Sequence, residues 1–210
     1  MVIAIDGPAA SGKGTLARRL AAHLGCPHLD TGLLYRAVAS RVLEEGAELT
    51  DEVAAIGAAQ RLDPARLADP ALRGSHMGEA ASVVSAVPAV RAELLAFQRR
   101  FAATPGGAVL DGRDIGTVVC PDADVKLYVT ASAEERAGRR FREFKGAGQS
   151  VTLEAVLAEI HRRDERDRSR SAAPLALAPG ATVLDTTGLD ADEAFAGALA
   201  IVTRAIDRAA

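Results

Sequence analysis

Residues 2–15 read VIAIDGPAASGKGT, and this stretch decides the fold. Residues 2–5 are a short apolar run bounded by Asp6 and Gly7, which is typical of a buried parallel strand. From Lys13 to Leu24, leucines recur at helical spacing on one face, with charged side chains elsewhere. The stretch therefore predicts a strand, a glycine-rich turn and a helix, in that order.

The turn between them has the chemistry of a phosphate site. Glycines let the backbone pass close to phosphate oxygens, and successive N–H groups and the helix N-terminus attract an anion. Lys13 adds a point charge for the β- and γ-phosphates. Gly14 stands where the strict GxxxxGK[ST] pattern has Ser or Thr, so Thr15 is the available hydroxyl. We predict a nucleoside triphosphate site formed by Gly7, Pro8, Ala9, Ala10, Ser11, Gly12, Lys13, Gly14 and Thr15.

The rest of the chain alternates apolar runs with amphipathic stretches. Further strands are predicted at 27–30, 108–111, 125–130 and 181–185, and helices at about 33–45, 51–60, 79–101, 133–144, 152–168 and 190–208. Such alternation predicts an α/β fold with a five-stranded parallel sheet covered by helices on both faces. Proline and glycine interrupt 61–78, which is predicted to be irregular or briefly helical. Gly- or Pro-containing connectors at 144–150 and 171–180 bracket 152–168, as a mobile flap requires.

Composition excludes several classes of protein. With 210 residues, 49% of them hydrophobic, the chain is long enough to bury a core, so disorder is excluded. No apolar run approaches membrane-spanning length, and no leader pattern precedes residue 2, so we expect a cytoplasmic protein without a membrane partner. The net charge of −3 argues against a nucleic-acid-coating protein. Cys26 and Cys120 have no disulfide or metal-site spacing and are expected to be buried thiols.

Acidic and basic side chains complete the candidate site. Asp111 ends a predicted strand, from which its carboxylate can hold the hydration shell of Mg²⁺, with Thr15 as the other metal-binding candidate. Residues 162–170 read RRDERDRSR, which places Arg163, Arg166 and Arg170 on one helix face. A lone charge run of this kind is more often a solvated helix with i, i+4 ion pairs. Beside a phosphate site, it instead suggests cations that surround a transferring phosphoryl group.

Three segments extend the phosphate loop into a family resemblance. LDTGLLYRAVA (29–39), LDGRDIGTVVCPDADVKLYVTAS (110–132) and RRDERDRSRSAAPL (162–175) resemble the bacterial cytidylate kinases, within the P-loop nucleoside monophosphate kinases. The likeness spans nearly the whole chain and keeps motif order and spacing. It implies a P-loop NTPase-type three-layer fold in a single domain: a core at about 1–30, 102–140 and 180–210, an acceptor-binding region at 31–101, and an Arg-rich lid at 141–175.

The resemblance also implies residue roles. By this resemblance, Arg36, Arg113 and Arg170 bind the phosphate of the acceptor, CMP. Arg163 and Asp167 contact its pentose. The residues implied to bind cytosine are Ser82, Arg91 and Asp114, which match its amino donor and its N3 and O2 acceptors. Asp30 and Thr31 match an acidic–hydroxyl pair beside the acceptor. Arg136 and Arg140, at the base of the lid, are candidate ATP contacts.

The implied activity is transfer of the γ-phosphoryl group from MgATP to CMP or dCMP, in pyrimidine nucleotide metabolism. Its catalytic candidates are Lys13, Arg113, Arg163 and Arg170, and a monomer without nucleic acid or membrane partners is expected. Another small-molecule kinase of adenylate, uridylate or shikimate type is the near alternative. A nucleotide switch is disfavoured because no NKxD follows the DxxG at 185–188. An RNA-binding module is disfavoured by interleaved acids and by an aromatic content of 3%.

The small net charge conceals an asymmetry. Residues 136–170 carry ten Lys and Arg against six Asp and Glu, so this segment is basic and the remainder is acidic. A basic flap over an acidic body suits anionic mononucleotides better than a long polyanion.

Overall fold

The computed structural model describes residues 1–209, and a five-stranded parallel sheet with the order β2-β3-β1-β4-β5 lies at its centre. The strands are β1 (Val2–Asp6), β2 (His28–Asp30), β3 (Ala108–Gly112), β4 (Val125–Thr130) and β5 (Thr182–Asp185). The predicted sheet is confirmed, and each strand agrees with its expected bounds to within one residue. The apolar runs of β1 and β3 are buried on both faces of the sheet, whereas the edge strand β5 is largely exposed.

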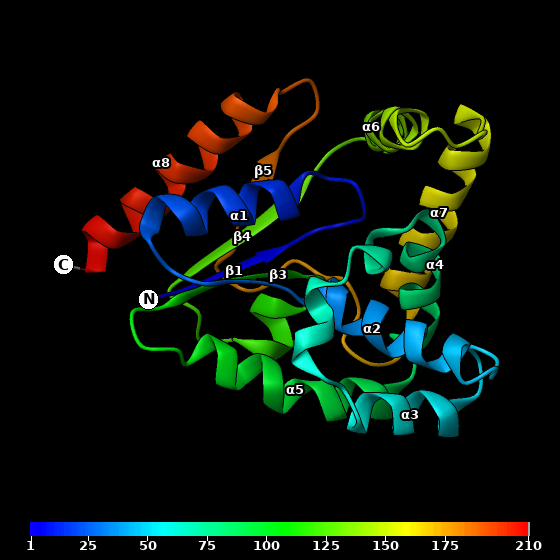
Figure 1. Cartoon of the computed structure of the whole chain (residues 1–210). Coiled ribbons are helices and arrows are strands. Elements are labelled where there is room, and N and C mark those ends of the chain that lie inside the picture. Colours follow the sequence, from blue (N-terminus) through cyan, green and yellow to red (C-terminus); the bar gives the residue numbers. More distant parts are fainter. Residues whose placement is uncertain (210) are drawn as a thin grey trace.

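Helices cover both faces of the sheet, as expected (Figure 1). They are α1 (Lys13–Leu24), α2 (Thr31–Glu44), α3 (Glu52–Gln60), α4 (Ser75–Val84), α5 (Pro88–Ala102), α6 (Ala133–Gly146), α7 (Leu153–Ser169) and α8 (Ala191–Ala209). α1 and α8 pack on one face, through a core that includes Leu16, Leu20 and Val202. α2 to α5 pack on the other, through Leu34, Val38 and Leu94 among others.

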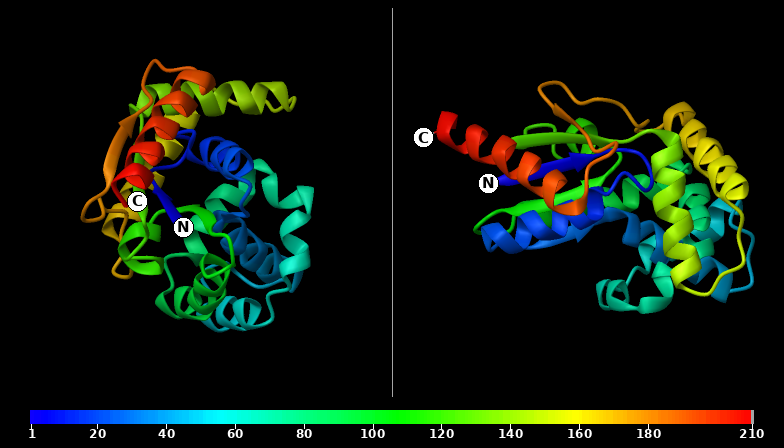
Figure 2. Two further views of the ribbon diagram at one scale, coloured as in Figure 1. Left: turned by 90° about the vertical axis from the view of Figure 1, so that its left-hand side faces the viewer. Right: turned by 90° about the horizontal axis from the view of Figure 1, so that it is seen from above.

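α6 and α7 lie past the carboxyl ends of the strands, opposite the end that carries both termini (Figure 2). A small apolar cluster joins them to the phosphate loop, since Ala9 packs with Ala137, Phe144, Val156 and Ile160. The sheet register aligns these strand ends, with Asp30 opposite Asp111. This edge is where ligands bind in open parallel sheets.

The single helix predicted over 79–101 is wrong. The chain forms two helices there, α4 and α5, which are bent by 101° at the break. The cause is Pro88, because proline disfavours helical conformation in the preceding residue, and Val87 is extended with φ −77° and ψ 114°. Proline is well suited to the first turn of α5 itself.

Residues 61–78 agree with the prediction over most of their length. They form two short 3₁₀ helices, Pro64–Ala68 and Pro70–Arg73, before α4 begins at Ser75. A single π-helical turn at Ile115–Val119, which periodicity gave no reason to expect, follows β3. Cys26 and Cys120 are both partly exposed rather than buried.

In the part of the chain that the structure describes, no single helix is long and apolar enough to cross a membrane. α4 and α5 reach that length and composition together, across their sharp bend.

Candidate active site

The phosphate loop, residues 7–15, connects β1 to α1 and is held in an unusual backbone conformation. Gly7 has φ 154°, and a Cβ there would lie 2.0 Å from the carbonyl oxygen of Val129, so no other residue fits. Ala10 and Gly12 follow in the left-handed region, with φ 59° and 88°. Successive turns of this kind direct N–H groups toward one concavity, which is what an anion site requires.

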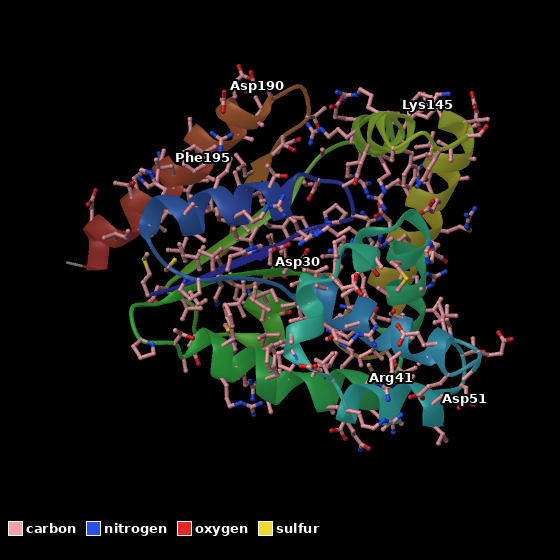
Figure 3. The ribbon with its side chains drawn as sticks, in the orientation of Figure 1. Asp30, Arg41, Asp51, Lys145, Asp190 and Phe195 are labelled. Carbon is pink, nitrogen blue, oxygen red and sulfur yellow. The ribbon has the colours of Figure 1, made fainter. Side chains whose placement is uncertain are left out.

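A cavity of about 360 Å³ opens directly above the loop. The loop, the ends of β2 and β3, and the facing sides of α6 and α7 form its walls. Of the residues predicted for ATP, metal or acceptor contacts, those that line it are Ala9, Ala10, Gly12, Lys13, Gly14, Thr15, Asp30, Arg36, Asp111, Arg113, Arg140 and Arg163. Gly7, Pro8 and Ser11 shape the loop without lining this cavity. Figure 3 shows Asp30 at the centre of the molecule.

Lys13 is the buried cation of this cavity. Its Nζ donates a hydrogen bond to the carbonyl oxygen of Pro8 at 3.2 Å. Burial, and then the positive charge of Arg113, lower the pKa of Lys13 from 10.5 to about 7, although Asp111 and Asp30 oppose the shift. A bound anion would therefore favour the charged form of this amine.

Asp111 and Thr15 both line the cavity, and their oxygens suit magnesium. Asp111 Oδ1 lies 2.7 Å from Nε2 of His28, so the imidazole orients the carboxylate. Among residues 1–209, no group of three or more His, Cys, Asp or Glu side chains could hold a metal ion. One carboxylate and one hydroxyl fit an ion that arrives with substrate phosphates and keeps most of its waters, rather than one caged by protein.

A second cavity of about 40 Å³ adjoins the first, with Arg113 and Arg163 in the wall that they share. The other predicted acceptor residues that line it are Thr31, Ser82, Arg91, Asp114, Asp167 and Arg170. Tyr35 and Ser85 also line it, although the sequence did not indicate them. The predicted acceptor residues therefore divide between two connected cavities.

The inner end of the second cavity is polar and prearranged. Arg91 Nη2 lies 2.5 Å from Asp114 Oδ2, and its other amino nitrogen donates to the carbonyl oxygen of Ser85 at 3.2 Å. Arg170 Nη2 lies 3.8 Å from Asp114 Oδ1. The hydroxyl of Ser82 is buried without a hydrogen-bond partner among the described residues. A buried, unpaired hydroxyl beside a fixed ion pair indicates that a ligand completes the arrangement.

Cations outnumber anions where the two cavities meet. Arg113 Nε donates to Asp167 Oδ2 at 2.7 Å, and despite opposing burial, Asp167 raises the pKa of Arg113. Arg163 is partly exposed, but its Nε is buried without a hydrogen-bond partner in the described structure. Burial, and then Arg113, lower the pKa of Arg163 to about 10. An anion between these side chains would relieve their mutual repulsion.

The resemblance implied that Arg136 contacts ATP, but the structure places Arg139 at the cavities instead. Arg136 is buried in an ion pair with Asp164 and lines none of the cavities described here. Arg139, which sequence reasoning missed, lines the main cavity and also a third cavity of about 160 Å³. The arginine triplet at 136, 139 and 140 gave no means of choosing between them.

The third cavity lies beside the loop, between α1 and the segment that leads into α8. Arg139 fixes its wall by donating to the carbonyl oxygen of Thr186 at 2.7 Å and to its hydroxyl at 3.0 Å. Asp190, at the start of α8 in Figure 3, accepts backbone hydrogen bonds from Asp192 and Glu193. β5 ends at Asp185, and Asp190 caps α8.

Asp6 is a further residue that the sequence did not single out. It is buried at the end of β1, and its carboxylate accepts hydrogen bonds from the N–H groups of Ile115 and Gly116, each at 2.7 Å. Burial raises its pKa from 3.8 to about 6, against those two bonds. Asp6 thereby anchors the turn that follows Arg113 and Asp114.

Known proteins resemble the chain throughout. A family model described as Cytidylate kinase matches residues 3–204. The chain is 65% identical over 202 residues to a cytidylate kinase of Xanthobacter autotrophicus, with 96% of this chain and 97% of the relative covered. A cytidylate kinase of Methylobacterium sp. is 68% identical over 202 residues, with 96% of each chain covered. An uncharacterized protein from Eubacterium ventriosum shares the fold, with a TM-score of 0.57 at 16% identity over 97% of this chain and 98% of its own. This chain belongs to the cytidylate kinase family.

Proposed function

We propose that this protein transfers the γ-phosphoryl group of ATP to the phosphate of CMP or dCMP. One observation carries the proposal: a phosphate-loop cavity and a smaller cavity lined by Ser82, Arg91 and Asp114 meet at Arg113 and Arg163. Two phosphates bound from opposite sides would face each other there. Membership of the cytidylate kinase family supports the choice of acceptor.

The donor nucleotide would occupy the main and third cavities. Backbone N–H groups of the loop, together with Lys13 and Arg140, would hold its phosphates. The third cavity shares Gly12, Thr15 and Arg139 with the main one and includes apolar side chains of Leu16 and Val129. An adenine ring fits this mixed surface, with the Arg139 guanidinium against its face.

Thr15 and Asp111 would hold a Mg²⁺ ion, partly through water. Such an ion would neutralise phosphate charge when it is bound. His28 keeps the Asp111 carboxylate in place for this contact.

The acceptor would occupy the second cavity. Asp114 accepts from the cytosine amino group, while Arg91 and Ser82 donate to N3 and O2. Uracil reverses the donor and acceptor at two of these positions, so UMP would leave buried polar groups unpaired. Asp167 and Arg163 reach the pentose. Asp30 and Thr31 border the acceptor, whose phosphate is held by Arg36, Arg113 and Arg170.

The chemical step needs positioning and charge stabilisation rather than a general base, since a nucleotide phosphate is largely ionised near neutral pH. Lys13, Arg113, Arg163 and Arg170 would stabilise the charge that spreads over the transferring group. In this proposal residues 31–101 are the acceptor region, and 141–175 are a lid that excludes water over the core. The proposal also includes a monomeric enzyme that acts in the cytoplasm.

An acceptor survey tests the proposal. The purified protein is incubated with MgATP and CMP, dCMP, UMP, AMP or shikimate in turn, and ADP release is followed by a coupled assay. We expect CMP and dCMP to give the largest kcat/KM. A larger value for AMP, UMP or shikimate would overturn the assignment.

A further inference from the structure

Arg136 connects three segments that are distant in the chain. Its Nε donates to the carbonyl oxygen of Ala131 at 2.9 Å, where the chain enters α6. Nη1 donates to the carbonyl oxygen of Ala9 in the phosphate loop at 3.2 Å. Nη1 and Nη2 also hold Asp164 of α7 in a two-pronged pair, at 3.0 and 2.6 Å. Arg136 is 3% exposed, and four of the five N–H donors of its guanidinium bind these protein acceptors.

Both distant partners adjoin groups that line the main cavity. Ala9 directly precedes Ala10, whose φ of 59° is costly for a residue with a side chain. A fixed Ala9 carbonyl helps to hold that conformation. Asp164 directly follows Arg163, the arginine shared by both cavities. The positions of the loop backbone and of Arg163 therefore depend on one buried guanidinium.

We propose that Arg136 is a positioning residue for phosphoryl transfer. It fixes the phosphate loop and the start of the arginine cluster on α7 relative to each other, without touching either nucleotide. The proposal rests on the proposed function, since it concerns alignment of the two phosphates. It replaces the direct ATP contact that the family resemblance implied, because Arg136 lines none of the three cavities described above.

A single substitution at Arg136 or Asp164 would not separate a loss of positioning from a loss of stability. Arg136→Met leaves the buried Asp164 carboxylate unpaired, and Asp164→Leu leaves the guanidinium unpaired, so each variant is destabilised. The double variant Arg136→Met/Asp164→Leu removes both charges together. Its new side chains lie beside the apolar cluster of Ala9, Ala137 and Ile160. Replacing both partners of a buried pair by apolar groups is often neutral for stability.

The double variant tests the proposal. We expect its Tm to return close to the wild-type value, while kcat with CMP stays roughly 10- to 100-fold lower because the reacting groups are no longer aligned. The KM for CMP should rise by a smaller factor than kcat falls, because Arg163 is one of several side chains that line the second cavity. Release of ADP without matching CDP should rise, since misaligned acceptor lets water compete. A double variant with wild-type kcat and coupling would overturn the role of Arg136.

Arg136→Lys provides a second measurement that does not depend on how the double variant folds. Lysine keeps the positive charge beside Asp164, but a single amine cannot reach Ala131, Ala9 and both carboxylate oxygens. We expect kcat to fall while Tm falls less than in Arg136→Met, because the charge of Asp164 stays paired, and a wild-type kcat would contradict the proposal. Arg142→Met is the matched control, because Arg142 lies on the same helix with its side chain 72% exposed.

The two proposals fail in different ways. A wild-type protein that phosphorylates another acceptor better than CMP contradicts the proposed function, and the Arg136 variants are then compared on that acceptor. An active wild type with an equally active double variant contradicts only the role of Arg136.

Discussion

Lys13 is the residue on which most of the proposed chemistry converges. It begins α1, is buried below the loop, and faces Arg113 and Arg163 across the cavity that holds them all. Burial and the charges of Arg113 and Arg163 disfavour the positive charge of Lys13, and Asp111 and Asp30 oppose them only in part. Polyphosphate supplies the missing negative charge, which makes Lys13 the first residue to test.

Replacing Lys13 by alanine should reduce turnover by at least about 10²- to 10³-fold, the scale seen when one oxyanion-stabilising donor is lost. CMP affinity should change little, because Lys13 does not line the second cavity. Steady-state kinetics and calorimetry of CMP binding measure the two effects. Lys145→Ala is the control, since Lys145 is exposed at the outer end of α6 (Figure 3). Wild-type rates in Lys13→Ala would refute the loop assignment.

The lowered pKa of Lys13, about 7, predicts a proton linkage. Above pH 7 the empty enzyme holds mostly neutral Lys13, and bound phosphates favour the charged form, so ATP binding at pH 8 should take up close to one proton. Calorimetry in buffers of different ionisation enthalpy measures this uptake, which should disappear in Lys13→Ala. In the empty enzyme, the unfolded chain binds more protons between pH 7 and 10.5, so this group makes stability rise with pH over that window.

Asp114 is the carboxylate that would read the cytosine amino group. Asp114→Ala should lower kcat/KM for CMP far more than for UMP, reducing the preference by about 10²-fold or more, since an unmatched polar contact carries that much discrimination. Competition kinetics with both nucleotides give the ratio directly. Asp122→Ala serves as the control because Asp122 is exposed. An unchanged ratio would rule out this reading of the base.

Among the elements, α4 has a glycine, Gly78, where its helix backbone approaches two arginines of the cavities. Its Gly78 would place a Cβ 3.1 Å from Arg163 Nη1 and 3.5 Å from Arg140 Nη2. Glycine in a helix interior costs about 0.5–1 kcal/mol relative to alanine. The close approach of two arginines to the helix backbone explains why a glycine suits this position.

Gly78→Ala should therefore stabilise the protein slightly and still lower kcat several-fold, because Arg163 and Arg140 must shift. Gly138→Ala is the matched control: this glycine is also inside a helix, and a Cβ there meets nothing within 4 Å. Both variants should gain Tm, and only Gly78→Ala should lose activity. Equal kcat values for the two would show that the arginines tolerate the displacement.

At the scale of the whole molecule, α7 and α4, which are distant in the sequence, are in contact. Arg166 Nη2 of α7 lies 2.7 Å from Glu79 Oε1 of α4. The other terminal atoms of this pair, Oε2 and Nη1, are buried without hydrogen-bond partners in the described part of the chain. The contact is therefore incomplete, and it links the two regions between which the acceptor would lie.

Glu79→Gln should weaken CMP binding by about 2- to 5-fold, because a partly exposed ion pair contributes about 1 kcal/mol or less. The Tm of the empty protein should change little for the same reason. Calorimetric titration with CMP measures the affinity, and Glu93→Gln on α5 is the control. Unaltered CMP affinity in Glu79→Gln would mean that the contact does not help to hold the acceptor.

Local patterns predicted the elements because each depends on a few neighbouring residues. The apolar run before Asp6 and the glycine-rich turn after it predicted a strand and the phosphate loop, and the spacing of leucines predicted α1. The break at Ser85–Val87 was also encoded locally, in Pro88, and was missed because helical periodicity continues across it. The π-helical turn at Ile115–Val119 had no local cause, since it depends on Asp6, more than a hundred residues earlier.

By itself, the sequence determined the parallel α/β sheet, the phosphate loop and the set of polar residues that surround it. Only the tertiary structure decided how those residues divide between cavities, because the register that sets Asp30 opposite Asp111 and the packing of α4 against α7 are long-range contacts. Three neighbouring arginines illustrate the difference. Their chemistry is identical in the sequence, yet helix geometry turns Arg139 and Arg140 to the cavities and buries Arg136 against Asp164 and Ala9.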